Sequence, residues 1–378
     1  NFIPNISLPE ASRCTSVRWG LLLALCCAFS FSVRAATIFV KADATTGDNN
    51  GTTWQHAYTD LHTALTNAVS GDVIYVAYGT YKPSKPPYGL VTDDPRDFAF
   101  ELKVRVSLYG GFAGTEATLG ARLFNSEGAT ILSGDLGSND GPDFDNRDDN
   151  TYHVVTGHNL AQAVGSFPTQ YLGVTFDGFT VRGGNADGPG TLKMGSYDFN
   201  RTFGGGLYVF NSSNYLTGTV GVNFLTVNNC IFTENLALNG GGAIYTSAVA
   251  ARYFELRVNK SAFTGNIITG GNTEEAHGGG AIYAVACGLS VQDDSFAGNK
   301  ALNRLGGAIL TFSPPSSPTR SVLNISTSTF TQNEAAQGGA INANSYTTIT
   351  GLSDCTFTGN KAKSVGDLSG SGGAVVCI

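Results

Sequence analysis

An acidic stretch between residues 135 and 149 is richer in potential metal ligands than any other part of the sequence. Its carboxylates and neighbouring amides offer oxygen atoms, and Ca²⁺ prefers roughly six to eight of these. The spacing differs from that of an EF-hand loop, and Asp, Asn and Gly are also ordinary turn residues. Two interpretations therefore stay open, bound calcium or plain turns. The candidate ligands are Asp135, Asp140, Asp143, Asp145, Asp148 and Asp149.

A second set of charged residues is a candidate for the cleavage of polysaccharides. A lyase needs an acidic calcium site with an Arg or Lys base, and a hydrolase needs two carboxylates at a set separation. Arg257 is the candidate base, and Asp293 and Asp354 are the candidate carboxylate pair, with Asp294 as an alternative partner of Asp293. A salt bridge between Lys260 and Asp293 would explain the charge without catalysis. Neither a Ser-His-Asp order nor a nucleotide-binding loop is visible.

The elements that must position these residues are sequence repeats. Five copies follow the pattern Leu-x-Val-x4-Phe-x-x-Asn, then a variable gap and Gly-Gly-Ala-Ile, with Thr350, Leu352 and Val375 as variations in the last copy. The phenylalanines recur every 27 to 34 residues, which is too short for a domain and suits one coil of a solenoid. A degenerate copy precedes them, with Leu172, Val174 and Phe179 at the same offsets and Gly205 to Tyr208 closing the unit.

Each repeat predicts three short strands. Leu-x-Val alternates with period two, so both apolar residues face one side, and a polar corner separates them from the inward Phe. Gly-Gly-Ala-Ile begins the third strand. The fold class is therefore all-β, a parallel β-helix in which equivalent residues stack about 4.8 Å apart. The stacked columns are expected to be Phe232, Phe263, Phe296, Phe330 and Phe357, and, as an amide ladder, Asn235, Asn266, Asn299, Asn333 and Asn360.

The paired Phe-x-x-Asn and Gly-Gly-Ala-Ile motifs resemble the repeats of the polymorphic outer-membrane-protein family of autotransporter adhesins. The resemblance covers roughly Leu172 to Val375, about half of the chain. It implies a right-handed β-helix of the pectate-lyase-like superfamily, surface display and adhesion. It leaves the ligand, the anchor and the export route open.

The sequence divides into four predicted segments. Residues 1–35 are an upstream extension and a signal peptide, because Arg13 and Arg18 precede an apolar run that small residues end. Residues 36–82 form a cap and the first coil, in which an amphipathic helix beginning near Trp54, with a capping box at Thr52, covers the apolar end. Residues 83–171 form irregular coils with the acidic loop. Residues 172–378 are regular coils, and we expect the protein to continue beyond them.

Four cysteines remain after the signal peptide, namely Cys230, Cys287, Cys355 and Cys377. Cys230 and Cys355 occupy the same column four coils apart, which is roughly 19 Å at the strand spacing. A disulfide requires Cα atoms within about 7 Å. We therefore expect free thiols.

Composition limits the classes of function. The chain has 378 residues, of which 13% are charged and 49 are glycine, and its net charge is −7. This profile suits a β-solenoid and disfavours nucleic acid as a partner. Together with this profile, the resemblance to the polymorphic outer-membrane-protein family implies a secreted or surface-exposed adhesin or structural stalk on a bacterial outer membrane, whose host-cell or glycan ligand is open. The alternatives are a carbohydrate-active enzyme, lyase or hydrolase, and a non-catalytic glycan-binding protein. No cofactor other than calcium is expected.

Overall fold

The computed structural model describes residues 35–122, 124, 129–160, 173–194, 197–211, 223–248, 254–270, 277–317, 319–344, 346–363 and 371–377. The chain divides into two compact units, Asn1–Ala35 and Ala36–Ile378. The fold described below is that of the second unit. The predicted signal peptide lies outside the described residues, apart from Ala35.

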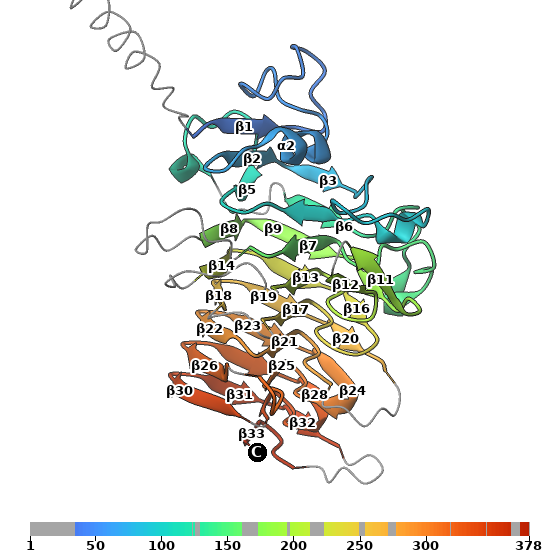
Figure 1. The fold of residues 1–378 in the computed structure, drawn as a ribbon. Helices are drawn as coiled ribbons and strands as arrows, with labels where there is room; N and C mark the ends of the chain where they lie inside the picture. The colour runs from blue at the N-terminus through green and yellow to red at the C-terminus, as the bar shows by residue number, and fades with distance from the viewer. Residues whose placement is uncertain are drawn as a thin grey trace, which may run out of the picture. The chain divides into compact units, whose positions relative to one another are not determined.

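Four sheets of parallel strands make up the second unit, and each coil of the chain contributes one strand to each sheet in the repeat region (Figure 1). The prediction of a parallel β-helix is thus confirmed. The three predicted strands are present, and a short fourth strand lies in the segment after each repeat asparagine, where the sequence suggested a loop. We number the sheets I to IV in the order in which a coil meets them.

Sheet I holds the Leu-x-Val strands and sheet II the Phe strands. Sheet I consists of β1 (Thr37–Val40), β2 (Val73–Ala77), β5 (Ser107–Phe112), β8 (Gly173–Asp177), β14 (Asn223–Asn228), β18 (Phe254–Asn259), β22 (Gly288–Gln292), β26 (Ser321–Ser326) and β30 (Thr347–Ser353). Sheet II consists of β3 (Gly79–Tyr81), β6 (Thr130–Ser133), β9 (Phe179–Arg182), β15 (Ile231–Thr233), β19 (Ala262–Thr264), β23 (Ser295–Ala297), β27 (Thr329–Thr331) and β31 (Thr356–Thr358).

Sheet III holds the short strands after each asparagine and sheet IV the strands after Gly-Gly. Sheet III consists of β10 (Asn185–Ala186), β16 (Leu236–Ala237), β20 (Ile267–Ile268), β24 (Lys300–Leu305), β28 (Glu334–Gln337) and β32 (Lys361–Ala362). Sheet IV consists of β4 (Phe100–Leu102), β7 (Val155–His158), β13 (Leu207–Phe210), β17 (Ile244–Ser247), β21 (Ile282–Val285), β25 (Ile309–Phe312), β29 (Ile341–Ala343) and β33 (Val375–Cys377). An antiparallel hairpin, β11 (Thr191–Met194) and β12 (Tyr197–Asn200), lies outside these sheets.

The glycines of the Gly-Gly motif serve two different purposes. The first glycine of each pair has a positive φ, which is +69° at Gly279. Residues with a side chain adopt this conformation only at an energetic cost. The second, such as Gly280, lies against the next coil, and a Cβ there would come within 2.2 Å of the Gly307 carbonyl oxygen. The motif therefore recurs because both the corner and the distance between coils exclude a side chain.

The interior of the helix contains two regular columns. The rings of the five repeat phenylalanines stack nearly parallel, with neighbouring centroids 4.7 to 5.1 Å apart. Beside them, each repeat asparagine donates its side-chain N–H to the side-chain oxygen of the next asparagine at 2.9 to 3.1 Å. Asn235, Asn266, Asn299 and Asn333 are fully buried. These columns hold successive coils in register.

The register of two predicted anchors differs from expectation. Val174 pairs with Leu225 and Phe176 pairs with Val227, so the degenerate copy is displaced by two residues, which preserves the inward face because side chains alternate with period two. Leu172 lies outside the described residues. In the last copy a bulge makes Ile349, not Thr350, the partner of Leu323.

The closing glycines of the degenerate copy also differ from the prediction. Leu207 pairs with Ile244, so the motif in this coil begins at Gly204, one residue earlier than the predicted Gly205. Gly204 has a φ of +66°, like the first glycine of the regular pairs. The extra glycine in Gly204-Gly205-Gly206 made both alignments compatible with the sequence.

The helix of the cap, α2 (Leu61–Asn67), is shorter than predicted. Its N-cap is Asp60, whose carboxylate accepts hydrogen bonds from the backbone N–H groups of His62 and Thr63, and the predicted capping box at Thr52 does not form. Trp54 lies before the helix and packs against the rings of Phe39 and Phe112. Three single-turn 3₁₀ helices, Pro95–Asp97, Leu119–Ala121 and Pro142–Phe144, complete the described helices.

The four cysteines of the described residues are free. Cys230 and Cys287 are buried, and burial raises the pKa of each thiol to about 12. Both thiols therefore stay protonated and behave as small apolar side chains.

Candidate functional site

The candidate base Arg257 lies on the outward face of sheet I, between Thr226 and Ser290 of the neighbouring strands. Its guanidinium contacts the Glu255 carboxylate at 2.7 Å and lies 4.1 Å from the centroid of the Phe224 ring. Glu255, on the same outward face, was not predicted as the partner of Arg257. The available signal was the spacing of Glu255 and Arg257, because residues two positions apart on a strand lie on the same face. The charge of Arg257 is balanced within its own strand.

Asp293 and Asp354 occupy the corner between sheets I and II. This corner residue has positive φ in all five coils, with values of +48° to +58°. The carboxylate of Asp293 accepts a hydrogen bond from the Thr327 hydroxyl, which lies in the coil between the two aspartates. Within the described part of the chain, Lys260 forms no ion pair with Asp293, so the predicted salt bridge is absent.

Asp294 points in the opposite direction from Asp293. Asp293 is exposed, whereas Asp294 is 2% exposed in an inward column of small residues, Cys230, Ser261, Asp294, Ser328 and Cys355. Its carboxylate accepts backbone N–H groups of Ser261 at 2.6 Å and Gln292 at 2.9 Å. Burial raises the pKa of Asp294 to about 7, although these two N–H groups act to lower it. The two adjacent aspartates thus do not face a common substrate.

The carboxylates of the acidic loop bind the loop's own backbone. Asp135 accepts N–H groups of Asn139 and Asp140, and Asp149 accepts that of Gly137. Arg147 lies 3.5 Å from the Asp140 carboxylate and donates to the Glu234 carbonyl, which belongs to the second coil after the loop. The remaining candidates, Asp143, Asp145 and Asp148, are exposed. In the part of the chain that the structure describes, no three His, Cys, Asp or Glu side chains are grouped as metal ligands.

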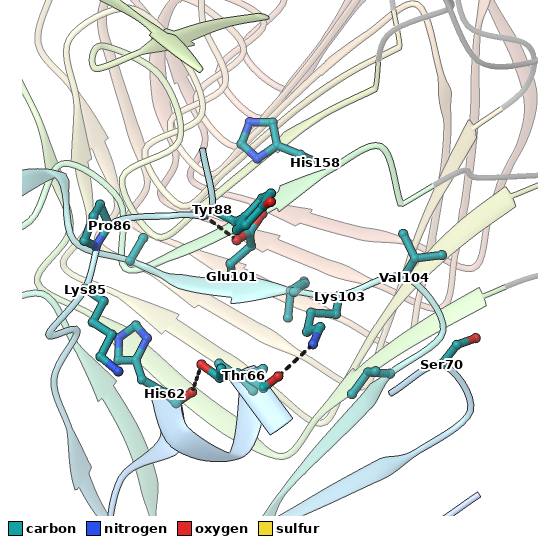
Figure 2. Close-up of a pocket in the computed structure, with 14 residues that line it drawn as sticks. His62, Thr66, Ser70, Lys85, Pro86, Tyr88, Glu101, Lys103, Val104 and His158 are labelled. Atoms are coloured by element: carbon teal, nitrogen blue, oxygen red, sulfur yellow. Dashed lines mark hydrogen bonds between the residues drawn. The ribbon is translucent and has the colours of Figure 1, made fainter. Parts of the chain in front are cut away.

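A cavity of about 650 Å³ lies beside α2 at the N-terminal edge of sheet IV (Figure 2). This volume falls in the range typical of small-molecule sites. Its wall combines apolar residues such as Leu65, Leu102 and Val106 with a small set of polar and charged side chains. These are His62, Thr66, Ser70, Lys85, Tyr88, Glu101, Lys103 and His158.

The polar groups of the cavity are held by specific contacts. One Glu101 oxygen accepts the backbone N–H of Tyr88 at 2.7 Å, and burial raises the pKa of the Glu101 carboxyl. Lys103 donates to the carbonyls of Thr66 and Ala68 and so caps the C-terminal end of α2.

The two histidines of the cavity are neutral. The His62 Nε2 accepts the Ser84 backbone N–H at 3.0 Å, and the ring stacks on Phe100. Burial lowers the pKa of both His62 and His158 to about 4. The cavity therefore has a rigid wall in which the charges come from lysine and glutamate.

Sequence reasoning did not single out any residue of this cavity. The available signal was Glu101-Leu102-Lys103, which places two charged residues on one face of an edge strand, together with Lys85-Pro86-Pro87-Tyr88. Neither pattern has a fixed repeat spacing, so the fold was needed to bring them together.

The fold and the interior columns define a repeat protein of the parallel β-helix class. Residues 229–247 and 354–378 match the family model of the Chlamydia polymorphic membrane protein repeat. These two segments of the chain are repeats of that type, as the motif resemblance predicts. A search of curated proteins finds no match. None of the helices in the described residues has the length and apolar composition needed to cross a membrane.

Proposed function

We propose that this chain is a surface-displayed β-helix that acts as an adhesin or as a structural stalk at a bacterial outer membrane. The observation that carries the proposal is the match of two coils to the polymorphic membrane protein repeat. That family is named for a membrane protein, and the chain carries its repeat on a parallel β-helix. Secretion through the predicted signal peptide belongs to the same proposal.

The outward face of sheet I supports a binding role. From β22 onward several of its outward residues are polar and uncharged, including Ser290, Gln292, Asn324 and Ser326. Asn228 and Asn259 are bonded to each other at 2.9 Å across two coils. A flat, stacked surface of this kind can make many weak polar contacts with a large partner, as the extended faces of solenoids do.

The proposal is tested by labelling intact cells of the source organism with an antibody raised against residues 223–363. We expect labelling before permeabilisation and release of β-helix fragments by an external protease. Labelling that requires permeabilisation would contradict surface display. An antibody against a cytoplasmic protein, tested in parallel, reports whether the cells stay intact.

A further inference from the structure

We propose that the cavity beside α2 binds a carboxylate-bearing sugar, of the uronic or sialic acid class. This inference goes beyond adhesion, because it assigns a ligand class to a site in the cap that lies apart from the repeat coils. A monosaccharide or disaccharide suits a cavity of about 650 Å³. The apolar wall and the convergent polar groups are the usual composition of such a site.

The charges in the cavity favour an anionic ligand. Two ammonium groups, Lys85 and Lys103, line it, and Glu101 is the one carboxylate among the lining residues. Lys85 is exposed and, within the described residues, forms no ion pair. The whole chain carries a net charge of −7, so the excess of positive charge in the cavity is opposite in sign to the net charge of the chain. A carboxylate would supply the missing partner.

Glu101 adds a hydrogen-bonding group. One of its oxygens accepts the Tyr88 N–H, and no partner contacts the other within the described part of the chain. The carboxyl oxygen without a partner can accept a hydrogen bond from a sugar hydroxyl. Thr66, Ser70 and His158 lie in the same wall and offer further partners for sugar hydroxyls.

Tyr88 supplies a stacking surface at the mouth of the cavity. Tyr88 is 90% exposed, while its backbone N–H is bonded to Glu101 (Figure 2). An exposed aromatic ring offers an apolar face to the C–H face of a sugar and a hydroxyl to its edge. The lining lysines present point charges to an anionic group, and the apolar wall and the hydroxyl-bearing side chains suit the rest of a sugar. The wall therefore suits a single carboxylate on a polyhydroxylated ring.

Calorimetric titration of the full chain tests the proposal. The probes are methyl glucuronide and its neutral match methyl glucoside, with N-acetylneuraminic acid as a second acidic sugar. We expect at least about tenfold tighter binding of an acidic sugar than of methyl glucoside, the usual effect of one charge-assisted hydrogen bond. The two acidic arms decide between uronic and sialic acid. Equal affinity for the acidic and neutral sugars, or no binding of either acidic sugar, would overturn the proposal.

Variants locate the site. Lys85→Ala and Tyr88→Ala should each weaken binding several-fold, because they remove the charge partner and the stacking surface of the ligand. Both variants should fold, because both side chains are exposed. Lys85→Arg should retain binding, and Lys361→Ala, which removes an exposed lysine in the last described coil, should leave it unchanged. Unaltered binding in Lys85→Ala would overturn the proposal, and so would displacement of the acidic sugar by an equal concentration of inorganic phosphate. Surface labelling of intact cells does not depend on any of these results.

Discussion

At the residue scale, Asp294 stands where two neighbouring coils have serine. The Ser261 hydroxyl and the Ser328 hydroxyl each accept a backbone N–H from the preceding coil, and the Asp294 carboxylate makes the same bond to the Ser261 N–H. The column needs an acceptor at this place, and a carboxylate provides one. The cost is a charge that burial disfavours.

The protonation of Asp294 should make stability depend on pH. Its folded pKa is about 7, above the value of about 3.9 in an unfolded chain. The folded state therefore binds the proton more tightly, and the free energy of unfolding should fall as pH rises from about 4 to about 7, by about 2–4 kcal/mol. Asp294→Ser should remove this slope. Urea unfolding at several pH values measures the effect.

The quantity to compare is the difference in unfolding free energy between the parent and Asp294→Ser. If this difference is the same at pH 4.5 and pH 7.5, the account of the buried carboxyl is contradicted. Asp293→Ser is the matched control, because Asp293 is exposed at the neighbouring position. It should leave the pH dependence close to that of the parent.

At the element scale, the asparagine ladder is saturated with hydrogen bonds. The Asn299 amide donates to Asn333 Oδ1 and to the Phe263 carbonyl, and its oxygen accepts the side-chain and backbone N–H groups of Asn266. These four bonds use the full capacity of the side chain. The adjacent phenylalanines fill the interior without a polar group.

Truncation of either column should destabilise the coils. Phe296→Ala removes a fully buried ring and should cost about 3–5 kcal/mol. Asn299→Ala leaves several buried polar groups without a partner, and each such group costs about 1–3 kcal/mol. The variant should therefore lose at least about 1 kcal/mol of unfolding free energy. Ser295→Ala, an exposed neighbour on the same strand, should change stability by less than about 0.5 kcal/mol. Thermal unfolding of the three variants decides, and equal melting of all three would contradict the packing.

The acidic loop carries a separate prediction about calcium. If exposed Asp143 and Asp145 recruit the ion together with Asp135, Asp140 and Asp149, free calcium at 100 times the Kd should stabilise the fold by about 2.7 kcal/mol. Asp143→Ala combined with Asp145→Ala should abolish the response, and Asp198→Ala, in the hairpin, should not. A melting temperature that neither calcium nor a chelator changes would contradict calcium binding. The composition of the loop would then be explained by its turns and by the Arg147 contact.

The repeats made some of these elements predictable and left others hidden. The constant distance from Leu to Phe fixes two strands and the corner, because packed backbone tolerates no insertion. The fourth strand was missed although its inward residue is visible two places after each asparagine, as Ala237, Ile268 and Ala301. Two residues are too few for a periodic pattern. The start of α2 was misplaced because Asp60, not Thr52, supplies the cap.

At the scale of the whole molecule, the candidate site depended on pairings that span the chain. The cavity joins α2, the loop after β3, the edge strand β4 and the end of β7. Glu101 pairs in register with Thr156, 55 positions later in the sequence. No spacing rule links such residues, whereas the coil-to-coil columns repeat at nearly constant distance. The β-helix was therefore predictable from the sequence, and the cavity beside α2 was not.

Three of the four charged candidates on the coils are held by contacts within the fold, and the fourth, Asp354, is exposed at the corner. Arg257 is paired with Glu255, and Asp293 accepts the Thr327 hydroxyl. A catalytic base or acid needs a pKa matched to its task and access to the substrate. The buried carboxyl of Asp294 meets the first condition and, at 2% exposure, fails the second. These contacts occupy Arg257 and Asp293 and keep Asp294 away from a substrate.

Binding and cleavage measured in the same sample test this account most directly. The purified full chain is incubated with pectin and with alginate, with and without calcium, and both polymer-bound protein and released oligosaccharides are quantified. We predict retention of the protein on a glycan or cell surface and no release of unsaturated or shortened products, because Arg257 is paired with Glu255 and Asp293 accepts the Thr327 hydroxyl. Appearance of such products, abolished by Arg257→Ala or Asp293→Ala, would contradict the adhesin account and identify an enzyme.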